Sequence, residues 1–248
     1  MSHNSKAVSL EVESVPTRQS MATPQPIYKV EARPVSPTPW ANHTTLGICV
    51  YAVANTMIAL HLMQVRGIQH SNVLVGVLWF VGGFGSWLVC VLELLKGNTF
   101  AYTVFGSFAG YYFAYAATLT PAFQIAAGYS STEEYNNSLG VFFAVWATLF
   151  FFYFFVSFKT NVVFVWIFAN VDATVWCLAA AYFQAGSGHA ASALRLNKAA
   201  GGLLLAASMG GWYMLLQELM EGVGFTYSLP LGSLASKPKA VTDHEHLE

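Results

Sequence analysis

The chain has 248 residues, of which 55% are apolar and only 9% are charged. Soluble domains usually carry about 25% charged residues, so a soluble protein of this composition could not cover its own surface. The net charge is −1 and Lys and Arg form no cluster, which excludes a phosphate-binding face for nucleic acid. The three cysteines lie in apolar runs and are too few for a disulfide framework or a zinc site. We therefore expect an integral membrane protein with neither a metal site nor a cofactor.

The first 40 residues carry no apolar stretch long enough for a signal peptide and are rich in Ser, Thr and Pro. Segments of this composition cannot bury enough apolar surface to fold. Residues 1–40 are therefore predicted to be a disordered cytoplasmic tail. Residues 222–248, which end in charged and polar side chains, are predicted to be a second, solvated cytoplasmic tail.

Between the two tails, residues 41–221 contain six apolar segments separated by polar or glycine-containing connections. Each segment is close to the length of about 20 residues that a helix needs to cross a bilayer. We therefore predict an all-α membrane protein, a bundle of six transmembrane helices. The predicted segments are Thr45–Met63, Asn72–Leu95, Thr103–Thr120, Leu139–Phe158, Asn161–Gln184 and Ala199–Met220.

The distribution of Lys and Arg predicts the orientation. Six crossings would place both tails, and the turns after the second and fourth segments, on one side of the membrane. That side would carry eight Lys and Arg residues and the other side three, and cytoplasmic loops carry the excess of positive charge. Both termini are therefore predicted to be cytoplasmic. The eight residues are Lys6, Arg18, Lys29, Arg33, Lys96, Lys159, Lys237 and Lys239, and the three are Arg66, Arg195 and Lys198.

The first segment contains two polar residues, Asn55 and Thr56, one turn after Tyr51. An amide in hydrocarbon needs hydrogen-bond partners, because an unsatisfied polar group there costs several kcal/mol. A water-lined pore would supply these partners, and so would a neighbouring helix. The sequence leaves both alternatives open.

The turn after the second segment contains Glu93, Lys96, Asn98 and Thr99. Glu93 and Lys96 are three residues apart and are expected to pair on one helix face. Asn98 and Thr99 follow a glycine and precede an apolar run, where a side-chain oxygen caps the free N–H groups of a helix. A structural role at this turn is favoured over a role in gating. Near the end of the sixth segment, three polar residues are predicted to be solvated at the headgroup level: Gln217, Glu218 and Glu221.

Asp172 lies in the fifth segment, at a depth of roughly 17 Å when counted from Asn161 at 1.5 Å per residue, near the bilayer midplane. No Lys or Arg lies at that depth in any predicted segment. Inserting such a residue costs about 2.5–3.5 kcal/mol, so it is expected to face protein or water and to have a function.

Three interpretations of Asp172 remain open. It would act as a proton relay if desolvation keeps its carboxyl protonated. It would instead hydrogen-bond across helices to Asn55, Asn170 or Thr174, or form part of a site for a cation such as ammonium. The hydrogen bond is favoured, because Asp172 is about 100° around the helix from Val171, so the two side chains cannot both point into one lumen.

The run "LELLKGNTF" at 92–100 gives the chain a recognisable signature. With the six-segment plan it resembles the YaaH-type acetate/succinate transporter family of bacteria and fungi, in which the second helix ends with Glu and Asn-Thr-Phe opens the third. These residues are Glu93 and Asn98-Thr99-Phe100 here. The segment "FVGGFGSW" at 80–87 also matches, with Ser86 where the family normally has Gln. The resemblance covers residues 40 to 221.

The chain departs from this family at its Asn-Pro-Ala-Pro-Leu-Gly motif. The aligned stretch, Asn42-His43-Thr44-Thr45-Leu46-Gly47, keeps Asn, Leu and Gly but loses both prolines. Proline stiffens the start of the first helix, because its ring fixes the backbone dihedral φ. The chain is therefore predicted to be a divergent member, with an altered substrate or a regulatory role as alternatives.

The resemblance implies a plasma-membrane channel or proton-linked transporter for acetate and related monocarboxylates, assembled as a hexamer with one pore per subunit. Family members narrow the pore with hydrophobic side chains, which correspond here to Tyr51, Phe108 and Val171; ordinary packing is the alternative interpretation of these residues. The polar candidates along the pathway are Asn42, Asn55, Thr56, Asn170 and Asp172.

Acetate transport is the leading prediction, with membrane lipid and a small carboxylate as partners and no nucleic acid. Ammonia or ammonium transport is the rival within transport, and a non-transporting membrane regulator is the second class. An enzyme is not expected, because the sequence has neither G-x-S-x-G nor H-E-x-x-H.

Overall fold

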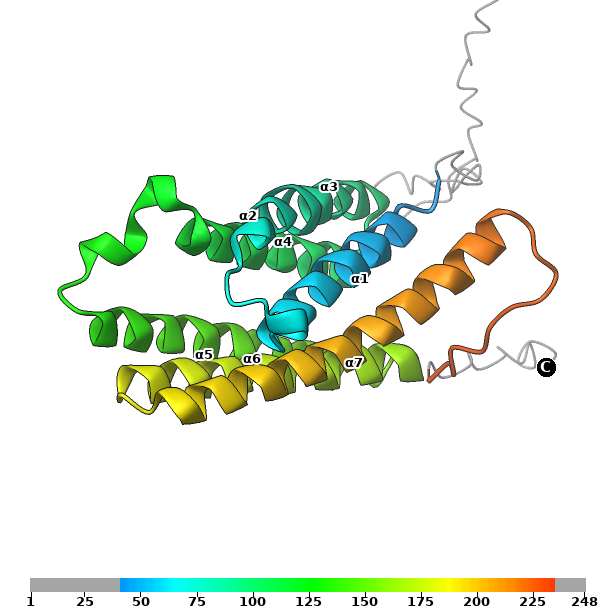
Figure 1. Ribbon diagram of the computed structural model, residues 1–248. Helices are drawn as coiled ribbons and strands as arrows, with labels where there is room; N and C mark the ends of the chain where they lie inside the picture. Colours follow the sequence, from blue (N-terminus) through cyan, green and yellow to red (C-terminus); the bar gives the residue numbers. More distant parts are fainter. Residues whose placement is uncertain (1–40, 235–248) are drawn as a thin grey trace, which may run out of the picture. The chain divides into compact units, whose positions relative to one another are not determined.

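The computed structural model describes residues 41–234, and the predicted tail at 1–40 and the end of the chain at 235–248 lie outside the described residues. All regular elements within the described range are helices (Figure 1). The α-helices are α1 (His43–Leu62), α2 (Asn72–Gly76), α3 (Ser86–Lys96), α4 (Thr99–Leu119), α5 (Thr132–Ser157), α6 (Val162–Gly186) and α7 (Ala190–Gly222). The shorter or irregular helices are η1 (Val65–Gly67), η2 (Val77–Gly85), η3 (Pro121–Phe123) and η4 (Ile125–Gly128).

Five helical segments in the described part of the chain are long and apolar enough to cross a membrane. They are α1, the continuous run Asn72–Lys96 formed by α2, η2 and α3, and then α5, α6 and α7. The prediction of an all-α membrane protein is therefore confirmed. The third predicted segment corresponds to α4, which has 21 residues but is not among the five. The tyrosines, threonines and glycines of α4 lower its mean hydropathy. Its length would still be enough to cross a membrane.

The helical segments surround a common core. Helix α5 packs along α6, α6 along α7, and α7 along α1, while α1 contacts η2 and α3, which pack on α4 (Figure 1). Helices α4 and α5 meet through large aromatic side chains instead of close backbones. Tyr111 of α4 lies against Phe142, Phe143 and Trp146 of α5, with ring centroids 5.4–6.3 Å apart. These contacts close the bundle.

Side-chain caps fix the start of three long helices. The side-chain oxygens of Asn98, Ser131 and Asn161 accept from backbone N–H groups of α4, α5 and α6 at 3.3, 3.1 and 2.9 Å. These caps satisfy N–H groups that have no partner inside the helix. As a result α4 and α5 begin several residues before the predicted segments. Helix α7, which has no side-chain cap, begins at Ala190 instead of near Ala199. The predicted start of α5 was wrong because its first two turns are polar, and that of α7 because Arg195, Asn197 and Lys198 interrupt the apolar run.

The second membrane segment contains a nine-residue π-helical stretch, η2. Its three glycines, Gly82, Gly83 and Gly85, allow side chains of neighbouring helices to approach the backbone. A Cβ atom at Gly82 would lie 2.7 Å from the ring of Tyr112, and one at Gly85 would lie 2.7 Å from Val50. We did not predict this π-helical stretch from the sequence. It connects α2 to α3 within one continuous membrane segment.

The chain after α7 turns back along the bundle and is not a freely solvated tail up to residue 234. Gly232, with a positive φ of 67°, accepts a hydrogen bond from the backbone N–H of Val162 at 2.9 Å. Leu234 donates to the backbone oxygen of Thr160 at 2.9 Å, and the Tyr213 hydroxyl donates to that of Pro230 at 2.9 Å. These bonds hold the segment against the α5–α6 turn.

Candidate functional site

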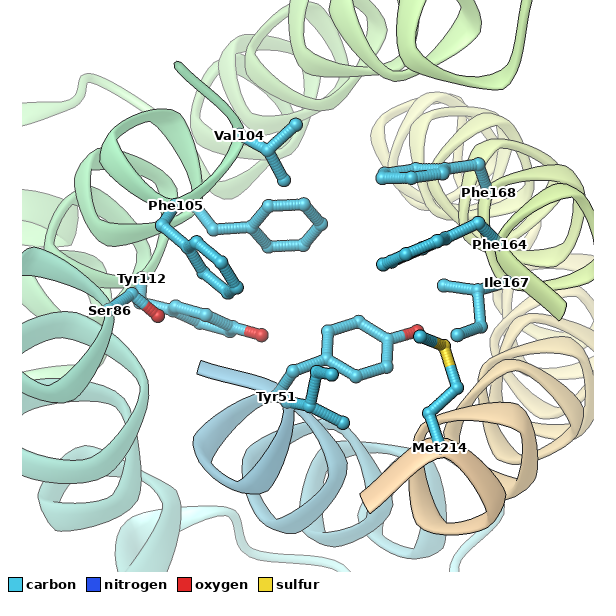
Figure 2. A pocket seen from close by; sticks show the side chains of 11 residues that line it. Tyr51, Ser86, Val104, Phe105, Tyr112, Phe164, Ile167, Phe168 and Met214 are labelled. Carbon is cyan, nitrogen blue, oxygen red and sulfur yellow. The ribbon is translucent and has the colours of Figure 1, made fainter. Parts of the chain in front are cut away.

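A small cavity of about 40 Å³ lies in the middle of the bundle. Its walls come from α1, α3, α4, α6 and α7 (Figure 2). Phe105 and Tyr112 of α4 stand opposite Phe164, Ile167 and Phe168 of α6, with Tyr51 of α1 between them (Figure 2). One water-sized group needs roughly 10–15 Å³ by this measure, so the cavity accommodates only a few such groups.

Two tyrosine side chains, Tyr51 and Tyr112, line this apolar cavity. The hydroxyl oxygen of Tyr51 is buried and has no hydrogen-bond partner among residues 41–234. The hydroxyl oxygen of Tyr112 accepts a hydrogen bond from the amide of Asn55 at 2.7 Å. Because Tyr112 accepts in that bond, its own O–H proton remains free to donate. The surface of the cavity itself is apolar, so both tyrosines contribute ring carbons and not their hydroxyl groups to it.

The predicted constriction residues occupy different positions relative to this cavity. Tyr51 and Phe108 both line it and contact each other edge to face, with centroids 6.0 Å apart. Phe108 is also stacked on Phe150 of α5, at 4.9 Å. Val171 is 3% exposed and lies in the core without lining the cavity. The sequence missed Phe164, Ile167 and Phe168, which form the α6 wall.

Three of the predicted polar residues do not line the cavity, and their side chains are held in hydrogen bonds. Asn55 bonds to Tyr112 and to the backbone oxygen of Tyr51 at 3.0 Å. Thr56 donates to Ala52 in its own helix at 2.6 Å and accepts from the indole of Trp212 in α7 at 2.9 Å. The amide of Asn170 donates to the backbone oxygen of Trp166 at 2.8 Å. These bonds fix side chains and join helices.

Asp172 is partly buried on α6 and does not line the cavity. Its Oδ1 atom is buried without a hydrogen-bond partner in the described part of the chain. The predicted partners are engaged elsewhere: Asn55 bonds to Tyr112, and the Thr174 hydroxyl donates to the backbone of Asn170 at 2.7 Å. Within residues 41–234 Asp172 makes no hydrogen bond to Asn55, Asn170 or Thr174, and the last two lie on its own helix. The prediction of an interhelical hydrogen bond to one of them is therefore wrong. Because buried polar atoms normally have a hydrogen-bond partner, the Oδ1 atom of Asp172 still needs one.

Two carboxylates meet the N-terminal end of α1. Glu218 of α7 accepts hydrogen bonds from the side chains of Asn42 and Thr45. The acceptor for the Thr44 hydroxyl is Glu93 of α3, which is fully buried. The first helix is thereby anchored to α3 and to α7, at the end where the helix dipole favours negative charge.

These contacts correct two predictions. Glu93 does not pair with Lys96, which is exposed; its only ion-pair contact within residues 41–234 is with His43. Glu218 is not merely solvated, because two side chains of the α1 start donate to it. The sequence did contain a sign of these contacts. Asn42, Thr44 and Thr45 place three side-chain donors at the start of one helix, and such donors need acceptors on neighbouring helices. Phe100, from the same motif as Glu93, packs edge to face on Tyr153 and Phe168.

The sequence model of the GPR1/FUN34/yaaH family matches residues 25–234 of the chain. The chain belongs to this family. The predicted family resemblance is therefore confirmed. Among curated relatives, the acetate transporter protein patA of Penicillium expansum is 33% identical over 190 residues, covering 76% of each chain. Ammonia transport outward protein 3 of Saccharomyces cerevisiae is 26% identical over 180 residues, covering 73% of this chain and 63% of the relative.

Among solved structures of this family's fold, the bacterial acetate channel SatP is similar to the chain with a TM-score of 0.66. The sequences are 22% identical, and the match covers 78% of this chain and 99% of that structure. The likeness shows that the bundle described above has the same fold.

Proposed function

We propose that this member of the GPR1/FUN34/yaaH family moves acetate and related small monocarboxylates across a membrane. The cavity enclosed by the helices carries the proposal, because it is small and apolar and because Tyr51 and Tyr112 contribute to its lining. Acetic acid is small enough for such a cavity, and a phenol whose hydroxyl turned into the cavity would donate to the carbonyl oxygen of the acid. Relatives that are named acetate transporters support this choice of substrate.

The apolar walls favour a neutral molecule over an anion in the cavity. Moving an isolated carboxylate into a dry, low-dielectric environment is strongly unfavourable unless it is paired with a cation. No Lys or Arg lines the cavity. The substrate therefore crosses this point as the acid, so a proton moves with each acetate. Proton-linked transport of acetate follows from that chemistry.

The proposal includes an arrangement in the membrane. Helix α4 is the sixth crossing, because its 21 residues span about 31 Å at 1.5 Å per residue, enough for the hydrocarbon core. Six crossings would leave both termini on one side of the membrane, and the excess of Lys and Arg on that side favours the cytoplasm of a plasma-membrane protein. Outward-facing aromatic side chains such as Phe152 and Phe155, 57% and 70% exposed, would contact lipid or further copies in a homo-oligomer such as a hexamer.

Uptake of labelled acetate into liposomes that contain the purified protein tests the proposal. Uptake is expected to saturate with acetate concentration and to increase with an inward proton gradient. Protein-free liposomes measure the acetic acid that crosses the lipid unaided. If uptake with the folded protein equals this background with and without the gradient, acetate is not the substrate.

Ammonia or ammonium is the second candidate, and Asp172 is the observation that favours it. Its buried Oδ1 atom lacks a partner in the described structure, and a cation would supply one. The yeast relative named as an ammonia transport protein supports this alternative.

Replacement of Asp172 by Asn distinguishes the two substrates. If a cation passes Asp172, loss of the carboxylate should lower ammonium flux by about tenfold, the equivalent of 1.4 kcal/mol. Acetate flux should stay level, because the acid crosses the cavity uncharged and Asp172 does not line the cavity. The two fluxes are measured in the same liposome preparation. Unchanged fluxes of both solutes would remove Asp172 from either mechanism.

A further inference from the structure

His43 and Glu93 form a buried contact between two helices at the N-terminal end of α1. His43 is the first residue of α1, and Glu93 lies in the last turns of α3. Their side chains are 10% and 0% exposed, and His43 Nε2 lies 3.5 Å from Glu93 Oε1. The Thr44 hydroxyl donates to the same carboxylate oxygen. The second oxygen, Oε2, is buried and has no partner within residues 41–234.

The atoms that face the imidazole are acceptors on both sides. His43 Nδ1 lies 3.3 Å from the backbone oxygen of Ala41, which can only accept a hydrogen bond. Nε2 faces Glu93, and an ionised carboxylate also can only accept. A neutral imidazole has one N–H and therefore leaves one of these two contacts without a proton. With one additional proton, either the imidazolium donates to both oxygens or a protonated Glu93 donates to Nε2.

The neighbouring charged groups do not compete for this proton. On α7, Glu218 is engaged by Asn42 and Thr45, and Glu221 is exposed. On α3, Lys96 is exposed, and the ion pair to Glu93 within the described range is made by His43. The acid that most needs a positive partner is therefore the fully buried Glu93, and the group placed to supply it is His43.

We propose that His43 and Glu93 together bind a proton, and that this proton controls the packing of α1 on α3 at the approach to the cavity. The same two helices carry cavity walls. Ile48 is five residues, or roughly 7 Å, along α1 from His43, and Ser86 is seven residues, or roughly 10 Å, along α3 from Glu93. A change in the contact therefore reaches the cavity through two continuous helices. The link to acetate flux, although not the proton site itself, rests on the proposed function.

Thermal unfolding of the purified protein as a function of pH tests the proton site without transport. The variants are His43→Gln and Glu93→Gln, which keep a side chain of similar size but cannot form the charged pair. The wild type is expected to be more stable than His43→Gln at low pH, where the site holds its proton, and to lose this advantage as the pH rises and the proton leaves. His70→Gln, an exposed histidine outside the bundle core, is the matched control and should run parallel to the wild type.

Two results would show that His43 and Glu93 do not bind a proton together. One is a stability difference between wild type and His43→Gln that stays constant with pH. The other is a pH dependence of stability in Glu93→Gln that runs parallel to that of the wild type. The double variant should behave like either single variant, because both remove one shared interaction. Transport gives the second readout. In the wild type, acetate flux should change with pH as the His43–Glu93 site loses its proton. This change should be absent in both single variants and present in His70→Gln. If the pH dependence of flux is the same in all of them, the proton does not control the cavity. If the wild type moves no acetate, the proposed function fails, while the unfolding data still decide whether the proton site exists.

Discussion

Replacement of Tyr51 by Phe is expected to stabilise the folded protein and to slow acetate transport. The Tyr51 hydroxyl is buried without a partner in the described structure, so it is desolvated without compensation. Removing such a group should stabilise the protein by about 1 kcal/mol or more. If the same hydroxyl donates to the acid in the cavity, its loss should lower flux by up to about tenfold, since one hydrogen bond contributes about 0.5–1.5 kcal/mol. Thermal unfolding in detergent and liposome flux measure the two effects.

The matched control is Tyr153→Phe. The Tyr153 hydroxyl is hydrogen-bonded to Ser107 at 2.8 Å, and Tyr153 does not line the cavity. This variant should lose stability and keep its flux, which is the reverse of the Tyr51 result. Unchanged flux in Tyr51→Phe would mean that the hydroxyl does not touch the substrate. A loss of stability in Tyr51→Phe would mean that the hydroxyl has a partner in the membrane-embedded protein, such as water.

Gly82→Ala is expected to destabilise the folded protein. The added Cβ would lie 2.7 Å from the Tyr112 ring, far inside van der Waals contact. Tyr112 is fully buried and its hydroxyl accepts from Asn55, so the ring cannot move away freely. Overpacking of this kind costs about 1–3 kcal/mol, more than the gain of at most about 1 kcal/mol from replacing Gly by Ala in a helix.

The control for Gly82 is Gly76→Ala in the same membrane segment. Nothing lies within 4 Å of a Cβ at Gly76, so this variant should be neutral or slightly stabilised. The midpoint of thermal unfolding measures both variants. Acetate flux should also fall in Gly82→Ala alone, because Tyr112 lines the cavity. Equal midpoints for the two variants would contradict the close packing of Gly82 on Tyr112.

The sequence predicted the helical architecture well because long apolar runs have few alternatives in a membrane. It placed the turn at Asn98 correctly, since a cap and a preceding glycine are local features. It misplaced the start of α7 by treating Ala190–Lys198 as a loop, because polarity at a membrane surface does not distinguish a helix from a loop. The π-helical stretch gave no recognisable signal beyond its glycines.

The site was harder to predict, because its contacts join residues far apart in the sequence. From their spacing, Glu93 was predicted to form an ion pair with Lys96. In the structure Glu93 instead contacts His43 and Thr44, about 50 residues earlier in the sequence. Helix periodicity gives the face on which a residue lies but not the helix opposite that face. Among residues 41–234 the hydroxyl of Tyr51 likewise has no partner, because the side chains that α6 and α7 place near it, such as Ile167 and Met214, are apolar. Tyr51 and Phe108 were placed in the pathway from the family resemblance, not from their pattern.

The π-helical segment Val77–Gly85 also constrains how the length of this protein can change during evolution. A π-helix accommodates more residues per turn than an α-helix, and such turns often mark functional regions. Deleting one residue here would allow a regular α-helix and would keep the residues after the deletion nearly in phase, because the π-helical turn holds the extra residue. Ser86 would then still lie beside the cavity and Glu93 would still face His43. A deletion from a regular α-helical turn has no such compensation: it rotates the residues on its two sides by about 100° relative to each other, so that in the second membrane segment it would misalign the cavity and the start of α1.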